Sequence, residues 1–258
     1  MISNRNISLA LGSGAAKGWA HIGIIKALKQ LGYKIRAISG TSSGAIIAAY
    51  EAFGLLDAFE EFVLNLDKKT VLSFYDVNFI PKKGLINGKK LTELFAEKLK
   101  NKNIEESSIP LYICASSLES GKCVTFSRGS VVDAIRASIS IPGIFTPVQI
   151  KGIFLVDGGI TNPVPVNILS ENNHKKIVGI DLNSPLEISY YREMPGIMNT
   201  INRSITIMSY YLTNTNLEKT NTWKILRPDL TDYGVFEFHR GKELIELGYK
   251  TVFNNFKT

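Results

Sequence analysis

The first part of the chain alternates between short apolar runs and stretches with helical spacing of apolar residues. Residues 7–11 and 35–38 are apolar runs of strand length, whereas residues 19–31 repeat apolar side chains every three or four positions. Residues 45–53 are apolar on almost every side, which predicts a helix that is buried all round. Strand, turn and helix thus follow one another twice, a pattern that predicts βαβ units and a parallel sheet.

The rest of the chain continues with helices and strands. Further helices are predicted at 55–66, 89–99, 131–138, 195–217 and 241–253, and further strands at 111–116, 122–126, 154–156, 177–182 and 223–226. Glu119-Ser120-Gly121 marks a hairpin between two of these strands. Residues 70–87 are irregular and contain Pro81, so they are expected to form a flap or cap.

These elements predict an α/β fold with a mostly parallel sheet sandwiched by helices. No internal repeat or low-complexity linker divides the chain, so one domain over residues 1–258 is expected. Open sheets of this kind bind their ligands at the carboxyl ends of the strands. The candidate residues below follow predicted strands, as that rule requires.

Composition excludes several classes of protein. The chain has 258 residues, of which 45% are hydrophobic, as in ordinary globular proteins. No apolar run approaches the roughly 18 residues needed to span a bilayer. Arg5 and the apolar run 7–11 look like a short signal peptide, but glycines interrupt the run, so a cytoplasmic location is expected. Cys114 and Cys123 form no CxxC motif, which predicts two reduced thiols and no zinc site.

The net charge of +7, from 30 Lys and Arg against 23 Asp and Glu, favours contact with anionic surfaces. The basic groups contain few aromatic residues and match no nucleic-acid-binding motif, so no nucleic-acid partner is expected. Peripheral contact with the anionic inner face of a membrane remains as an expectation. No pattern in the chain indicates an oligomeric state.

Gly40-Thr41-Ser42-Ser43-Gly44 fits G-x-S-x-G, the nucleophile elbow of serine hydrolases. A serine on a sharp turn between a strand and a helix has a strained backbone, and Gly40 and Gly44 relieve the crowding around it. The alternative for this pentapeptide alone is a Ser/Gly loop that caps a helix. The strand before it and the apolar helix after it favour the elbow.

A second glycine-rich turn, residues 12–18, follows the first predicted strand. Its spacing is G-x-G-x-x-x-G rather than the G-x-G-x-x-G of dinucleotide-binding proteins, and no acidic residue ends the second strand. No cofactor is therefore implied. The other ligand that suits such a turn is an oxyanion, held by two backbone N–H groups opposite the serine.

A serine nucleophile needs a base, and two arrangements are open. Asp157 ends a short apolar strand and is followed by two glycines. The order serine, acid, histidine of α/β-hydrolases is met by Ser42, Asp157 and either His174 or His239. The third histidine, His21, lies in the first predicted helix, and a structural role is expected for it.

Four motifs in order resemble the patatin-like phospholipase family, specifically its short bacterial members. They lie at 9–23, 40–45, 137–148 and 157–165, and residues after 167 carry no recognisable motif of the family. The matching positions include Gly12, Gly14, Lys17 and Gly18, then Gly40, Ser42 and Gly44, and finally Asp157, Gly158 and Gly159. Ser13, Ala15 and Lys17 depart from the glycines and the arginine that are usual in the first motif, which puts rate and substrate choice in question.

The resemblance implies a Ser–Asp dyad without a catalytic histidine. Ser42 would be the nucleophile and Asp157 its base, and the N–H groups of Gly14 and Ala15 would form the oxyanion hole. The implied reaction is hydrolysis of carboxylic esters through an acyl-enzyme, with phospholipids or lysophospholipids as the expected substrates and soluble esters or thioesters as alternatives. A non-catalytic protein that uses the glycine loop to bind a lipid or an anion is the remaining alternative.

Overall fold

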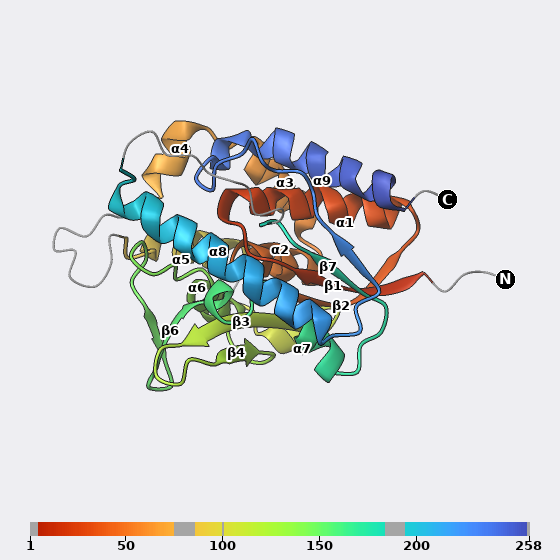
Figure 1. Cartoon of the computed structure of the whole chain (residues 1–258), viewed down its shortest axis with the longest axis horizontal. Coiled ribbons are helices and arrows are strands. Elements are labelled where there is room, and N and C mark those ends of the chain that lie inside the picture. The colour runs from red at the N-terminus through yellow and green to blue at the C-terminus, as the bar shows by residue number, and fades with distance from the viewer. Residues whose placement is uncertain (1–4, 75–85, 100, 184–193, 257–258) are drawn as a thin grey trace.

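The computed structural model describes residues 5–74, 86–99, 101–183 and 194–256 (Figure 1). An eight-stranded mixed sheet forms its centre, with the order β5-β6-β3-β2-β1-β7-β8 and with β4 paired to β3. The strands are β1 (Asn6–Leu11), β2 (Lys34–Thr41), β3 (Leu111–Ser117), β4 (Cys123–Phe126), β5 (Val148–Ile150), β6 (Ile153–Asp157), β7 (Ile177–Ile180) and β8 (Lys224–Leu226).

The α/β fold class predicted from the sequence is confirmed. Strands β3, β2, β1, β7 and β8 pair in parallel, whereas β4, β5 and β6 join through antiparallel pairs. The helices are α1 (Ala20–Gln30), α2 (Ser43–Ala52), α3 (Leu56–Leu64), α4 (Lys68–Ser73), α5 (Lys89–Leu99), α6 (Val131–Ser138), α7 (Val166–Glu171), α8 (Ile197–Glu218) and α9 (Gly241–Asn255). Short 3-10 turns lie at Ala15–Trp19, Ile104–Glu106, Gly158–Ile160 and Phe238–Arg240.

Alternation along the central strand places helices on both faces of the sheet. Leu9 and Leu11 of β1 belong to the large core that includes α1, α2 and α9, whereas Ala10 belongs to a smaller core with α7. Figure 1 shows α8 and α7 crossing one face of the sheet and α1 and α9 stacked together along another side. All ten residues of α2 are buried, as its uniformly apolar sequence predicts.

Helices α1 and α9 touch through glycines. A Cβ on Gly23 of α1 would overlap the backbone carbonyl of Ile245, and a Cβ on Gly248 of α9 would overlap the carbonyl of Ala20. The two backbones therefore pack closely along the side of the sheet. No side chain larger than hydrogen fits at either crossing point.

The expectation of two reduced thiols is wrong, because Cys114 and Cys123 form a disulfide. In the β3–β4 hairpin Cys123 pairs with Ser116, two positions beyond Cys114, so the cysteines are diagonal neighbours. Their Cα atoms are 6.3 Å apart, within the range that a disulfide spans. With the thiols paired, the cysteines give no support for a reducing compartment.

The irregular stretch predicted at 70–87 begins with helix α4, which the sequence pattern did not indicate. Residues 75–85 lie outside the described residues, so the predicted flap is not described. Strand β5 and helix α7 were also not predicted, since both are shorter than the windows in which periodicity is visible.

Candidate active site

Ser42 sits on a sharp turn between β2 and α2, with a positive φ of 56°. A Cβ on Gly40 would overlap the carbonyl of Gly44, and a Cβ on Gly44 would overlap the carbonyl of Leu11. Each flanking glycine of G-x-S-x-G is thus required by a close backbone approach. The turn presents the Ser42 side chain at the carboxyl end of β2, with the N-terminus of α2 behind it.

Asp157 reaches Ser42 because two strands meet end to end. Strand β4 occupies one edge of β3, so β2 and β6 share the other edge, where Thr41 pairs with Cys114 and Asp157 pairs with the next residue, Ala115. Strand β6 runs antiparallel to β2, so the carboxyl ends of the two strands point at each other. As a result Ser42 Oγ donates a hydrogen bond of 2.6 Å to Asp157 Oδ2, across 115 positions of sequence.

Burial sets the chemistry of this pair. Ser42 is 4% exposed and Asp157 6% exposed. Burial raises the pKa of Asp157 from 3.8 to about 6, although hydrogen bonds from Ser42 and the backbone N–H of Gly159 act in the opposite direction. At neutral pH the carboxylate is still mostly ionised, and it is a stronger base than an exposed aspartate.

Ser138, the last residue of α6, holds the backbone of Ser42. Its hydroxyl donates to the Cys114 carbonyl at 2.6 Å and accepts the Ser42 N–H at 2.8 Å. The N–H of Ser42 is therefore occupied within the protein. Sequence reasoning included Ser138 in a motif but assigned it no role, because no local pattern reveals a contact 96 positions away.

Two backbone N–H groups of the glycine loop belong to residues that line the pocket containing Ser42. The N–H groups of Gly12, Ser13 and Ala16 donate to the carbonyls of Ile180, Pro163 and Val235. Within the described part of the chain, the N–H groups of Gly14 and Ala15 have no acceptor, and both residues line the same pocket as Ser42 and Asp157. Ala15 has a positive φ of 49°, so this conformation is held against backbone strain.

His21 supports the loop from behind and does not approach the serine. It is fully buried, and its Nε2 lies 2.8 Å from the Gly12 carbonyl oxygen, so Nε2 carries the proton and donates it. Burial lowers the pKa of His21 to about 4, and the ring is neutral at physiological pH. The structural role expected for His21 agrees with this contact.

The remaining motif residues pack around the loop and the elbow. Lys17 is half-buried in the 3-10 turn that ends at Trp19. A Cβ on Gly18 would overlap Ser43, a Cβ on Gly158 would overlap the Cys114 carbonyl, and Gly159 donates its N–H to Asp157. These glycines let four separate segments come together around one pair of side chains.

The other two histidines lie elsewhere. His174 precedes β7, at the amino ends of the parallel strands, and its Nε2 is 3.1 Å from the Tyr112 hydroxyl. His239 belongs to the 3-10 turn before α9 and lines neither of the pockets that contain Ser42. Among the described residues, the side chain of Ser42 bonds to Asp157 and to no histidine.

Two pockets meet at Ser42. We call the first the polar pocket, because the Asp157 carboxylate and the Ser209 hydroxyl lie among the apolar groups of its wall; it also contains Gly14, Ala15 and Ile205 of α8. The apolar pocket is lined almost entirely by hydrophobic side chains from α2 to α5 and the residues next to them, from the loop after α6, from the 3-10 turn before α1 and from the segment before α9. They are Trp19, Ile46, Phe59, Phe62, Leu66, Val71, Phe74, Leu91, Leu94, Phe95, Ile139, Ile141, Ile144, Phe145, Phe236 and Phe238. Phe236 borders both pockets. Over the described ranges, no three His, Cys, Asp or Glu side chains gather closely enough to hold a metal ion.

The family model described as patatin-like phospholipase matches residues 9–170, which include the elbow, the glycine loop and Asp157. The chain belongs to the patatin-like phospholipase family. This patatin-like chain is 38% identical over 181 residues to an uncharacterized NTE family protein of Mycobacterium tuberculosis, covering 70% of the chain and 50% of that relative. The chain thus spans about half the length of this relative.

A second group of relatives carries a named activity. The patatin-like chain is 26% identical over 277 residues to the lysophospholipase NTE1 of Kluyveromyces lactis, covering 96% of the chain and 19% of that protein. Among solved structures, it is similar to VipD from Legionella pneumophila, with a TM-score of 0.45, 15% identity, and coverage of 96% of the chain and 66% of VipD.

Proposed function

We propose that this protein is a serine hydrolase that cleaves acyl esters of phospholipids or lysophospholipids with Ser42 as nucleophile and Asp157 as base. The observation that carries the proposal is the 2.6 Å hydrogen bond between these side chains at the junction of the polar and apolar pockets. Membership of the patatin-like family supports the reaction class. The name of the yeast relative supports a lipid substrate.

In the first half of the reaction, Ser42 Oγ attacks the ester carbonyl carbon while Asp157 takes its proton. The negative charge on the carbonyl oxygen lies opposite the N–H groups of Gly14 and Ala15, each of which is worth about 10²–10³ in rate in comparable oxyanion holes. Asp157 then gives the proton to the leaving alcohol oxygen as the ester C–O bond breaks. An acyl group remains on Ser42.

In the second half, water attacks the acyl carbon and gives a proton to Asp157. The bond between Ser42 Oγ and the acyl carbon breaks, Oγ regains the proton, and a carboxylic acid leaves. No histidine is required in this sequence, because the raised pKa of Asp157 makes the carboxylate a competent base near neutral pH.

The apolar pocket supports an acyl substrate. Its aromatic and aliphatic walls begin beside Ser42 and contain few polar atoms, so burial of a hydrocarbon chain there is favourable by about 0.8 kcal/mol per CH₂. Soluble esters with short chains would gain little from this pocket. The pocket therefore favours lipids over soluble esters as substrates.

Contact with a membrane surface is also proposed, through helix α8. Between residues 194 and 217 the sequence contains one charged residue, Arg203, and no acid. Ile197, Met208 and Tyr211 on this segment are 79%, 57% and 63% exposed, whereas Ile205 and Ser209 face the polar pocket. No helix in the described ranges has the length and hydropathy to cross a bilayer. A bilayer against the outer side of α8 would bring lipid esters to the pocket on its inner side.

We further propose that residues 1–258 act as one hydrolase domain. One hydrophobic core joins residues from Ile7 of β1 to Val252 of α9. The segment after 167, which lacks family motifs, supplies β7 next to the glycine loop, as well as Ser209 and Phe236 of the pockets. Both halves of the chain thus contribute to the site.

The test uses a fluorophosphonate probe and an ester panel. Wild type should be labelled and should hydrolyse long-chain lysophospholipid, and Ser42→Ala should do neither. Ser43→Ala is the matched control and should be labelled like wild type. Labelling that persists in Ser42→Ala, or loss of turnover in His174→Ala or His239→Ala, would refute the dyad, whereas absence of labelling in wild type would favour a non-catalytic binding protein.

A further inference from the structure

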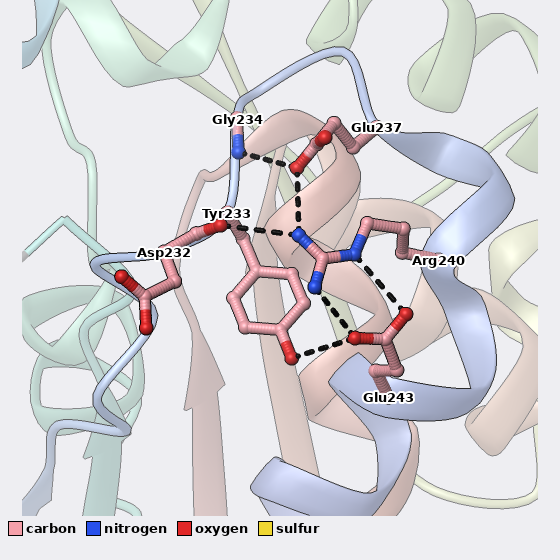
Figure 2. A network of polar contacts seen from close by, with 6 residues as sticks. All are labelled: Asp232, Tyr233, Gly234, Glu237, Arg240 and Glu243. Carbon is pink, nitrogen blue, oxygen red and sulfur yellow. Dashed lines mark hydrogen bonds and ion pairs between the residues drawn. The ribbon is translucent and has the colours of Figure 1, made fainter.

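The loop before α9 is held by a polar network centred on Arg240, which Figure 2 shows from close by. The Arg240 Nε and Nη2 atoms donate to the two carboxylate oxygens of Glu243 at 3.1 and 2.6 Å. Nη1 donates to the Asp232 carbonyl at 3.1 Å and to Glu237 Oε2 at 3.2 Å. The guanidinium also lies over the Tyr233 ring, 3.9 Å from its centroid.

The two carboxylates extend the network to the loop backbone and ring. Glu237 Oε2 accepts the Gly234 N–H at 2.9 Å, and Glu243 Oε2 accepts the Tyr233 hydroxyl at 3.1 Å. A single exposed ion pair contributes little, but a bidentate guanidinium with a stacked ring fixes geometry that a lysine does not reproduce. Arg240 thus ties residues 232–237 to the first turn of α9.

This loop is joined to the glycine loop at two points. The Val235 carbonyl accepts the Ala16 N–H at 3.1 Å, one residue after the proposed oxyanion donor Ala15. The Phe238 carbonyl accepts the Trp19 Nε1–H at 3.0 Å, at the other end of the same 3-10 turn. A shift of the 232–238 loop would therefore move the backbone that carries the Ala15 N–H.

The same loop places Phe236 between the two pockets. Its ring is 45% exposed and lines both the polar pocket and the apolar pocket, as do Ser42 and Ala15. An acyl chain that runs from Ser42 into the apolar pocket passes this ring. The position of Phe236 thus decides how well the acyl chain is separated from the rest of the substrate.

From these contacts we infer that Phe236 is a specificity-determining residue for acyl-chain length, and that Arg240 is a positioning residue that sets both Phe236 and the oxyanion loop. The inference rests on the proposed function for its substrate class. It assigns a role to a part of the chain that carries no family motif.

Two variants and one control test it. Phe236→Ala removes the ring, and Arg240→Lys keeps the charge but loses the fork and the stacking. Lys250→Met is the matched control, because Lys250 pairs with Glu246 in an exposed contact on the same helix. Glu243→Gln weakens the same fork and replaces Arg240→Lys if that variant does not fold.

The first measurement is the ratio of kcat/KM for p-nitrophenyl palmitate to that for the butyrate. We expect Phe236→Ala and Arg240→Lys each to move this ratio about tenfold toward unity, and the double variant to add little, since both act through one ring. We expect kcat of Arg240→Lys to fall about tenfold for both esters, because the Ala15 donor is displaced. Lys250→Met should match wild type.

The second measurement does not depend on turnover. Hydrogen exchange at the Ala16 amide should be about tenfold faster in Arg240→Lys than in wild type, because the Val235 acceptor moves away. Displacement of a fluorescent fatty acid by palmitate and by butyrate should show the same reduced preference for the long chain in Phe236→Ala and Arg240→Lys. If wild type hydrolyses no ester but exchange and displacement change as stated, the proposed function fails and the loop assignment stands.

The inference is overturned by either of two results in a folded protein. One is an unchanged chain-length preference in Phe236→Ala. The other is Ala16 exchange in Arg240→Lys, or in Glu243→Gln, that equals the rate in wild type and in Lys250→Met.

Discussion

Replacing Asp157 by asparagine separates catalysis from stability at one position. The amide has nearly the shape of the carboxylate, and its oxygen can still accept the Gly159 N–H that Asp157 Oδ1 accepts at 2.7 Å. The other end of the side chain, however, presents an NH₂ donor where Oδ2 accepts the Ser42 hydroxyl. Ser42 then has no base, and we expect Asp157→Asn to lose activity by about 10²–10⁴-fold.

The same change should stabilise the protein at neutral and alkaline pH. Burial raises the pKa of Asp157 from 3.8 to about 6 in the folded protein, so the folded state binds a proton more tightly than the unfolded state does. The contribution of Asp157 to the free energy of unfolding is fully present below pH 3.8. It declines by about 3 kcal/mol in total as the pH rises through about 6. Asparagine does not ionise and escapes this loss.

The assay is urea unfolding of wild type and Asp157→Asn at about pH 4 and about pH 8, alongside ester hydrolysis. Relative to wild type, the variant should gain about 2.5 kcal/mol of unfolding free energy between the two pH values, since a small part of the loss has already occurred at pH 4. In wild type, kcat/KM should fall about tenfold per pH unit below about 6, as the base becomes protonated. Activity of Asp157→Asn near that of wild type would refute the role of Asp157 as base. A difference in unfolding free energy that does not depend on pH would refute the raised pKa of the buried carboxylate.

Three further substitutions and one control test contacts around the site. Ser138→Ala should lower kcat about tenfold with little change in KM and lower the unfolding free energy by about 1–3 kcal/mol, because the Ser42 N–H loses its acceptor and the Cys114 carbonyl loses the Ser138 donor. Ester kinetics and urea unfolding measure the two effects, and a rise in KM alone would contradict this. His21→Phe should cost about 1–3 kcal/mol in the same unfolding assay, because the Gly12 carbonyl loses its donor, and unchanged stability would show that the bond contributes nothing. Gly44→Ala should yield no folded protein by circular dichroism, because the added Cβ would overlap the Leu11 carbonyl. The control is Gly121→Ala, whose added Cβ has no atom within 4 Å, and it should fold with an unfolding free energy lower by about 1 kcal/mol. A folded, active Gly44→Ala would refute the close approach of β1 to the elbow.

The parts of the site that a local pattern encodes were predictable. The elbow glycines and the loop glycines stand together in two short turns where a Cβ would overlap neighbouring atoms, so they leave a local signature in the sequence. Strand β6 was also predicted from its apolar run. Its antiparallel direction, which points Asp157 at Ser42, depends on a pairing with β3 that nothing near Asp157 specifies.

The contributions from distant segments were not predictable. Ser138, Val235 and Phe236 act through single contacts with residues that are far away in sequence, and single contacts produce no periodicity. The disulfide was missed for a related reason, since it depends on the register of one hairpin. The resemblance to a family identified the motif-bearing half of the site, and the structure added the loop before α9.

The glycine contact between α1 and α9 has a consequence for how the chain folds. Gly23 and Gly248 lie 225 positions apart (248 − 23), so α1 leaves the ribosome long before its partner is made. Until then the groove on α1 is open, and a neighbouring nascent chain or a chaperone can occupy it. Contacts of such long sequence separation slow folding, and here α9 completes the helix layer that α1 begins. We therefore expect docking of α9 to be a late step, so that α1 depends on chaperone protection until α9 has been synthesised.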